Sequence, residues 1–235
     1  GNHSARGGKG GDHSARGGPT ASAYNIASHF SGLEGSTHPT PVSMAGATTK
    51  EVLSLLREYG EAHDTVAEAA LARLTVMCTE GQGQEDACEM VFRTGGLVGV
   101  AKAMERHAGS VALLTYGCSL VGVLCDREDR VRVASDAGAL EAVVRAMKAH
   151  SDSEMQTAGC LALGQLSSSA ERSKRAADLG AISYVVSAMR ARPERAVLQA
   201  NGCMALASLT MGERASDHRR SELAVGARSP IVRLA

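Results

Sequence analysis

The sequence of 235 residues contains no tryptophan, four tyrosines, two phenylalanines and five prolines. The cores of β-sandwiches are rich in aromatic and β-branched side chains, so this scarcity argues against such a fold. Alanine, leucine, valine and methionine supply most of the apolar residues, and these suit closely packed helices. Charges balance, with 25 basic and 25 acidic residues. A strong nucleic-acid or anionic-membrane footprint is therefore not expected.

The six cysteines form no Cys-x-x-Cys pair, which argues against a zinc site. Cys118, Cys160 and Cys203 recur at a regular spacing and are predicted to be small buried residues at helix contacts. Free buried thiols indicate an intracellular, reducing compartment, either cytoplasmic or organellar. A transmembrane segment is not expected, because the longest apolar run, 111–125, is shorter than the span of about 18–20 residues that a membrane requires.

Motifs of catalysis are missing as well. The sequence has no Gly-x-Ser-x-Gly, no phosphate-binding glycine loop ending in Lys-Ser or Lys-Thr, and no His-Glu-x-x-His. We therefore expect a protein that is not an enzyme, with no catalytic residues, no metal and no cofactor.

What the sequence does contain is a repeated pattern. Gly95 and Gly138 are 43 residues apart, Gly138 and Gly180 are 42 apart, and Cys160 and Cys203 are 43 apart. A fixed period in this range predicts a stack of helical repeats, and such stacks usually present binding surfaces.

The predicted repeats form one array over residues 45–235. Their ranges are 48–81, 84–126, 127–169 and 170–212, with a partial fifth repeat over 213–235. Apolar spacing predicts helices at 50–61, 66–77, 85–93, 97–104, 111–125, 129–136 and 172–178.

Residues 1–44 differ from the rest, because glycine, serine and histidine dominate them. Such a segment cannot bury enough apolar surface to fold alone, so it is predicted to be a flexible or docking extension. Ile26, Phe30 and Leu33 fall at i, i+4 and i+7 of a short potential helix. This stripe is either a ligand that docks in cis or on a neighbouring copy, or a chance cluster.

The array resembles the armadillo repeat over about residues 48–235. The similarity lies in three helices per repeat, the period of 42–43, a Gly-Ala or Gly-Gly pair before the second helix, and an Ala-Leu-x-x-Leu-like third helix. It implies an all-α, right-handed superhelical solenoid whose third helices line a concave groove. In the family, ladders of Asn and Trp on these helices hold extended basic peptides.

Neither ladder is present here. The Asn positions fall on Arg73, Val123, Gln165 and Ser208, and the Trp positions fall on Ala69, Ser119, Leu161 and Met204. Without repeated amides and flat aromatic faces, a basic peptide has no regular rail to bind. This argues against a nuclear-import adaptor.

The groove that the resemblance implies is mildly apolar. Its predicted partner-binding residues are Arg73, Leu114, Val123, Leu161, Gln165, Met204 and Ser208. Such a surface suits an amphipathic helix or an apolar-anchored segment. The predicted function is therefore a scaffold or accessory subunit that binds a protein partner within a larger complex.

Two alternatives remain. Arg132, Lys174 and Arg220 each lie six residues before a glycine of the repeat, and Arg130 and Arg172 lie beside them. This basic stripe would suit nucleic acid or an acidic surface, or it is simply a solvated helix face. The array could also be a regulatory domain of a larger polypeptide, because its last repeat stops within the second helix.

His107 and His150 follow the second helix in successive repeats, and Arg192 takes the same place in the next. A cation at a helix C-terminus can satisfy free carbonyls. We therefore predict that these residues cap their helices and do not bind metal.

Overall fold

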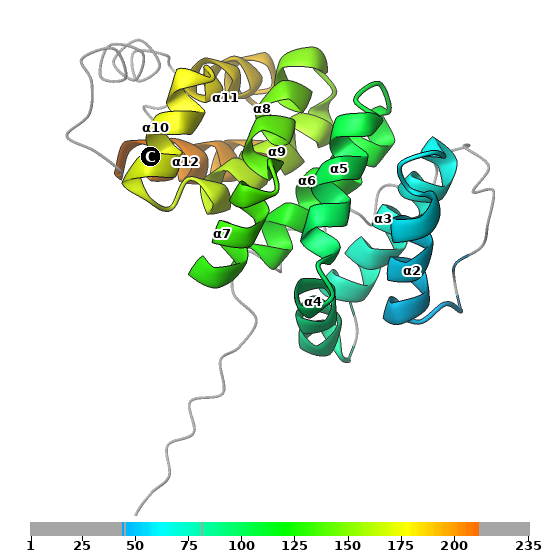
Figure 1. The fold of residues 1–235 in the computed structure, drawn as a ribbon. Helices are drawn as coiled ribbons and strands as arrows, with labels where there is room; N and C mark the ends of the chain where they lie inside the picture. Colours follow the sequence, from blue (N-terminus) through cyan, green and yellow to red (C-terminus); the bar gives the residue numbers. More distant parts are fainter. Residues whose placement is uncertain (1–43, 45, 81, 212–235) are drawn as a thin grey trace, which may run out of the picture.

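The computed structural model describes residues 44, 46–80 and 82–211. Over these ranges the chain forms eleven helices and no strand, which confirms the predicted all-helical class (Figure 1). The helices are α2 (Thr49–Tyr59), α3 (Asp64–Thr79), α4 (Gln84–Arg93), α5 (Gly96–Arg106), α6 (Val111–Leu124), α7 (Glu128–Asp136), α8 (Ala139–Ala149), α9 (Ser153–Leu166), α10 (Ala170–Asp178), α11 (Ala181–Ala191) and α12 (Ala196–Met211). The predicted tail stripe of Ile26, Phe30 and Leu33, Arg220 and the partial fifth repeat lie outside the described residues.

The helices follow a repeating order of short first, longer second and long third helix. The third helices pack in series, with α6 between α3 and α9, and with α9 between α6 and α12. The second helices α5, α8 and α11 also pack in sequence order. Figure 1 shows this progression from α2 and α3 at one end to α10, α11 and α12 at the other.

The glycines that set the sequence period form the corner before each second helix. Gly95, Gly138 and Gly180 have φ angles of 75°, 84° and 86°, in the left-handed region. Each is the residue immediately before α5, α8 or α11. A side chain at these positions would be strained, so glycine is what allows the sharp turn between first and second helix.

A second set of glycines brings the second and third helices close together. A Cβ atom placed on Gly159 of α9 would lie 2.6 Å from Cγ of Met147, a buried residue of α8. The methionine therefore fills the space where a side chain would stand. The same contact recurs between Gly117 and Met104 and between Gly202 and Met189.

The two histidines join successive repeats. Nε2 of His107 donates to the carbonyl of Gly60 at 2.7 Å, and Nε2 of His150 donates to that of Ala108 at 2.8 Å. Both acceptors belong to the preceding repeat, at the end of its second helix, so the prediction that each histidine caps its own helix is wrong. Arg192, in contrast, donates to the carbonyl of Ala191, the last residue of α11, at 3.1 Å, and so caps its own helix as predicted.

Glutamines from the third helices take the capping role. Nε2 of Gln156 donates to the carbonyl of Met147 at 2.8 Å, and Nε2 of Gln199 donates to that of Met189 at 2.8 Å. These carbonyls lie in the last turn of a second helix, where no intrahelical donor remains. The sequence signal is the spacing of 43 between the two glutamines, which the sequence analysis missed.

The recurring cysteines differ in burial. Cys118 and Cys160 are fully buried, as predicted, whereas Cys203 is exposed. One face of α9 is covered by α12. Among the described residues, no helix covers the equivalent face of α12. Burial raises the pKa of both Cys118 and Cys160 to about 12, so these thiols stay protonated at neutral pH.

We expect alkylation of the native protein to modify Cys203 first. Cys118 and Cys160 should react at least about a hundredfold more slowly, because both burial and a protonated thiol suppress nucleophilic attack. Mass spectrometry of peptides after timed iodoacetamide treatment measures the three rates separately. Labelling of Cys118 or Cys160 at the rate of Cys203 would contradict the packing described here.

Candidate interaction surface

Side-chain caps fix where the third helices begin. The hydroxyl of Ser110 accepts a hydrogen bond from the Leu113 amide at 3.2 Å, at the start of α6. The carboxylate of Asp152 accepts from the amides of Glu154 and Met155, both at 3.0 Å, at the start of α9. Each cap satisfies amides that the helix leaves free, and so sets which residues face each neighbour.

The third helices pack closely at two further glycines. A Cβ atom on Gly122 of α6 would lie 2.7 Å from Leu161 of α9, and one on Gly164 of α9 would lie 3.4 Å from Met204 of α12. Leu161 is therefore 3% exposed, and Leu114 is 1% exposed. This corrects the prediction for these two leucines, which belong to the core and do not line an open surface.

The other five predicted groove residues keep accessible surface. Met204 is 36% exposed, and Arg73, Val123, Gln165 and Ser208 are partly buried. Val123, Gln165 and Ser208 are each the thirteenth residue of their third helix, so stacking places them in a row across the array. Arg73 lies on α3 about one turn before the corresponding position. Met204 lies one turn before Ser208 on the same side of α12. We call these five residues the third-helix row.

The predicted basic stripe is only partly present. Arg132 and Lys174 are exposed on the first helices, as a surface stripe requires. Arg130 and Arg172, which were expected to strengthen it, are turned inward, with 1% and 12% of their side chains exposed. Their charges are used within the array and are not presented to a partner.

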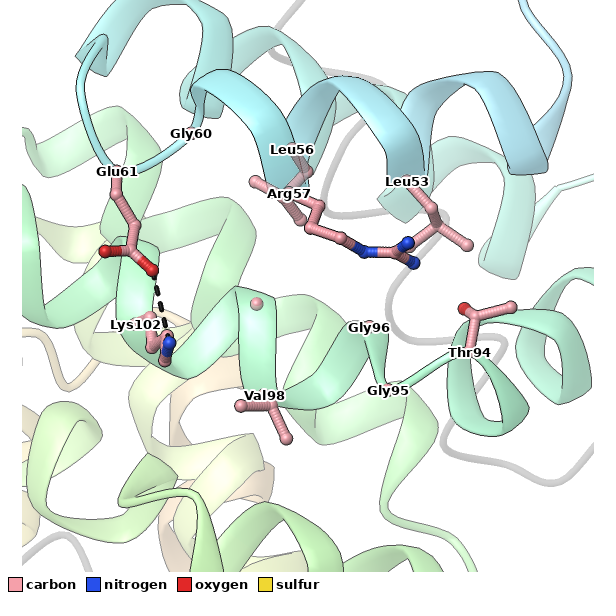
Figure 2. Close-up of a pocket in the computed structure, with 11 residues that line it drawn as sticks. Leu53, Leu56, Arg57, Gly60, Glu61, Thr94, Gly95, Gly96, Val98 and Lys102 are labelled. Carbon is pink, nitrogen blue, oxygen red and sulfur yellow. Dashed lines mark hydrogen bonds and ion pairs between the residues drawn. The ribbon is translucent and has the colours of Figure 1, made fainter.

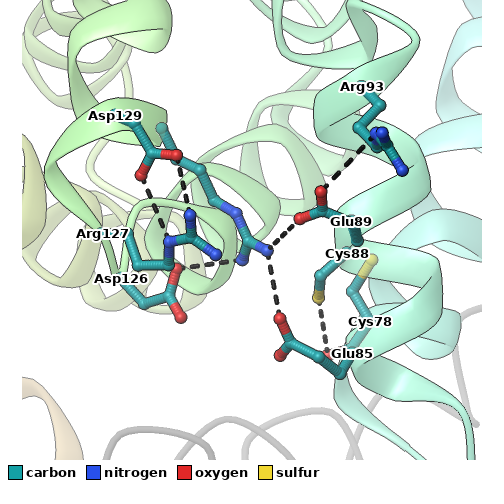
Figure 3. A network of polar contacts seen from close by, with 9 residues as sticks. Cys78, Glu85, Cys88, Glu89, Arg93, Asp126, Arg127 and Asp129 are labelled. Atoms are coloured by element: carbon teal, nitrogen blue, oxygen red, sulfur yellow. Dashed lines mark hydrogen bonds and ion pairs between the residues drawn. The ribbon is translucent and has the colours of Figure 1, made fainter.

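Arg130 forms the centre of an ion-pair cluster between α7 and α4. Its Nη2 atom lies 3.1 Å from Glu85 and 3.0 Å from Glu89, and its Nη1 atom lies 3.0 Å from Asp126. The guanidinium also lies over the ring of Phe92, 5.8 Å from its centroid. Figure 3 shows the three carboxylates of this cluster, those of Glu85, Glu89 and Asp126. The cluster therefore binds one repeat to the next.

Arg172 repeats this role one unit later. Its Nη2 atom lies 2.8 Å from Glu128, and its Nε atom donates to the carbonyl of Leu166 at 3.0 Å. The signal in the sequence is the spacing of 42 between Arg130 and Arg172. Each of the two arginines has an acidic partner in the preceding repeat.

A cavity between α2 and α5 is a second possible site (Figure 2). It has a volume of about 210 Å³ and is lined by Leu56, Val98 and several glycines, with an ion pair of 3.3 Å between Lys102 and Glu61 at its edge. Small-molecule sites usually measure about 300–1,000 Å³, so this cavity is small for a ligand or substrate.

A larger cavity, of about 330 Å³, lies between the C-terminal ends of α8 and α11. His150 lines it, but its Nε2 atom already donates to Ala108. Across the residues that the structure describes, no three His, Cys, Asp or Glu side chains are grouped so that they could hold a metal ion. Unlike these two cavities, the third-helix row spans several repeats.

No family model matches the chain, and no curated protein matches it either. In the part of the chain that the structure covers, every helix is too short or too polar to cross a membrane.

Proposed function

We propose that the chain is an armadillo-type solenoid, a right-handed superhelix, that acts as a non-enzymatic interaction scaffold or accessory subunit in a larger assembly. The observation that carries this proposal is the third-helix row. It places one accessible position per repeat on helices that are held rigidly by their neighbours. A rigid row spanning four helices suits a long ligand, such as a peptide segment, better than a small molecule.

The chemistry of the row suggests the kind of segment. Val123 and Met204 offer apolar contacts, and Gln165 and Ser208 offer neutral hydrogen-bonding groups. Arg73 supplies a positive charge at the α3 end, and its Nε atom is buried without a hydrogen-bond partner among the described residues. The occupant that fits is an amphipathic helix of a partner protein, with apolar anchors and an acidic residue directed at Arg73.

The alternative of a nucleic-acid adaptor has less support. Arg130 and Arg172 are paired with carboxylates of the array, which leaves Arg132 and Lys174 as the exposed members of the stripe within the described residues. Two separated cations supply little of the phosphate neutralisation that nucleic-acid binding requires.

We expect the double substitution Val123→Glu with Met204→Glu to reduce partner recovery at least about tenfold, because it places two charges in the apolar part of the interface. The measurement is quantitative mass spectrometry of partners crosslinked to the full-length chain in native extract. Proteins recovered by wild type and lost in this variant are the candidates.

Val98→Glu is the matched control. Val98 is 38% exposed, similar to Met204, but it lies on the second helix α5. The control should recover the same proteins as wild type. Equal recovery by wild type, the double variant and the control would overturn the proposal. If a further variant, Phe30→Glu, were the one that lost the partner, binding would be assigned to the N-terminal extension.

A further inference from the structure

Two cysteines meet where the first repeat joins the second. Cys78 lies in the last turn of α3 and Cys88 in the middle of α4, and they are 3% and 5% exposed. The Cys88 thiol donates a hydrogen bond to the carbonyl oxygen of Cys78 over 3.8 Å (Figure 3). The two thiol groups also interact with each other. The Cys88 sulfur therefore lies against the main chain of Cys78, and the two buried side chains are neighbours, as a disulfide requires.

One member of this pair shares its helix with the Arg130 cluster. Cys88 lies on α4 between Glu85 and Glu89, the two carboxylates of that helix that bind the guanidinium. The hydrogen bond from the Cys78 thiol lowers the pKa of Cys88, and Arg130 acts in the same direction, against the opposing effects of burial and of Glu85 and Asp126. The pKa of Cys78 is raised, first by its hydrogen bond with Cys88 and then by burial.

The pair thus contains two different sulfurs. The lowered pKa makes Cys88 the more readily ionised of the two, and the thiolate is the nucleophile in sulfur chemistry. Cys78 keeps its proton and stands next to Cys88, in the position of a resolving thiol. Burial raises the pKa of Cys125 to about 12, although the charge of Arg130 acts to lower it.

We propose that Cys78 and Cys88 are a redox modification site, at which a hydroperoxide converts the two thiols into a reversible disulfide between α3 and α4. In the first step the Cys88 thiolate attacks one oxygen of hydrogen peroxide, the O–O bond breaks, and Cys88 becomes a sulfenic acid while the other oxygen leaves as hydroxide and takes up a proton to form water. In the second step the Cys78 sulfur attacks Cys88, the S–O bond breaks and water leaves. The dithiol loses two electrons and two protons, and one hydrogen peroxide becomes two waters.

The disulfide would tie α4 to the end of α3, beside the ion pairs that hold α7 on α4. Oxidation would therefore act on the junction between the first two repeats. A thiol donor such as glutathione reverses it by exchange.

The test uses the full-length chain with Cys203→Ser, which removes the exposed thiol that could crosslink two molecules. The protein is treated with hydrogen peroxide in its native state, quenched, and mapped as non-reduced peptides. A Cys78–Cys88 linked peptide should form at least about tenfold faster than any oxidation of Cys118 or Cys160. Dithiothreitol should return both thiols.

Two variants in the same background test the roles of the sulfurs. Cys78→Ser should leave Cys88 as a sulfenic acid that dimedone traps, whereas Cys88→Ser should leave Cys78 reduced. Cys125→Ser is the control and should oxidise as the parent does. The proposal is overturned if Cys78 and Cys88 stay reduced until the chain unfolds, or if Cys88 pairs instead with Cys125.

Discussion

Replacing Arg130 by methionine should lower the free energy of unfolding by about 3 kcal/mol. Methionine keeps much of the volume beside Phe92 but removes the charge. Glu85, Glu89 and Asp126 then face one another without a cation. Because these carboxylates are partly exposed to water, the cost should lie at the lower end of the range for breaking a buried ion pair. Urea denaturation followed by circular dichroism measures it.

The control lies two residues further along α7. Arg132 is exposed, so Arg132→Met should change the free energy of unfolding by less than about 0.5 kcal/mol. If the two substitutions cost the same, the Arg130 cluster contributes no more than a surface charge, and its role in joining the repeats is wrong.

Alanine at Gly159 should destabilise the protein by about 2 kcal/mol. The added Cβ atom would stand 2.6 Å from Cγ of Met147, which is 3% exposed and enclosed by the core. Helices α8 and α9 must then separate, or the methionine must leave its preferred rotamer. This cost exceeds the gain of about 1 kcal/mol that alanine brings to a helix interior. Thermal and chemical denaturation report the difference.

The same substitution at Gly99 should have the opposite sign. A Cβ atom there would lie 3.6 Å from Leu56, an ordinary van der Waals contact. Gly99→Ala should therefore stabilise the protein by about 0.5 kcal/mol through helix propensity alone. If alanine stabilised the protein at both glycines, the packing of Met147 would not require the absence of a side chain at Gly159.

The positions of the helices could be predicted from the sequence because their signals are local. The corners at Gly95, Gly138 and Gly180 need only a residue that tolerates positive φ. Glycine is that residue, so the corners can be located in the sequence. Apolar spacing then placed α4 at 85–93, against Gln84–Arg93 in the structure. Periodicity alone was enough for the elements and for their order.

The site was harder to predict, because burial depends on which neighbour packs where. Leu161 and Met204 are equivalent in sequence, yet Leu161 is closed in and Met204 remains accessible. Cys160 and Cys203 differ in the same way. Arg130 resembles a surface cation until its side chain is seen to reach carboxylates about one repeat earlier. Such contacts depend on the angle between stacked repeats, which a single sequence does not state.

The serial packing of α3, α6, α9 and α12 also governs how the molecule bends. Each third helix makes its main contacts with the one before and the one after, so curvature is the sum of small rotations at separate junctions. A change of a few degrees at the α3–α6 junction is multiplied by the length of the array and becomes a displacement at α12. If a partner spans the row as proposed, its fit would depend on the curvature of the whole stack, and loosening one junction would alter that fit at positions far from the junction.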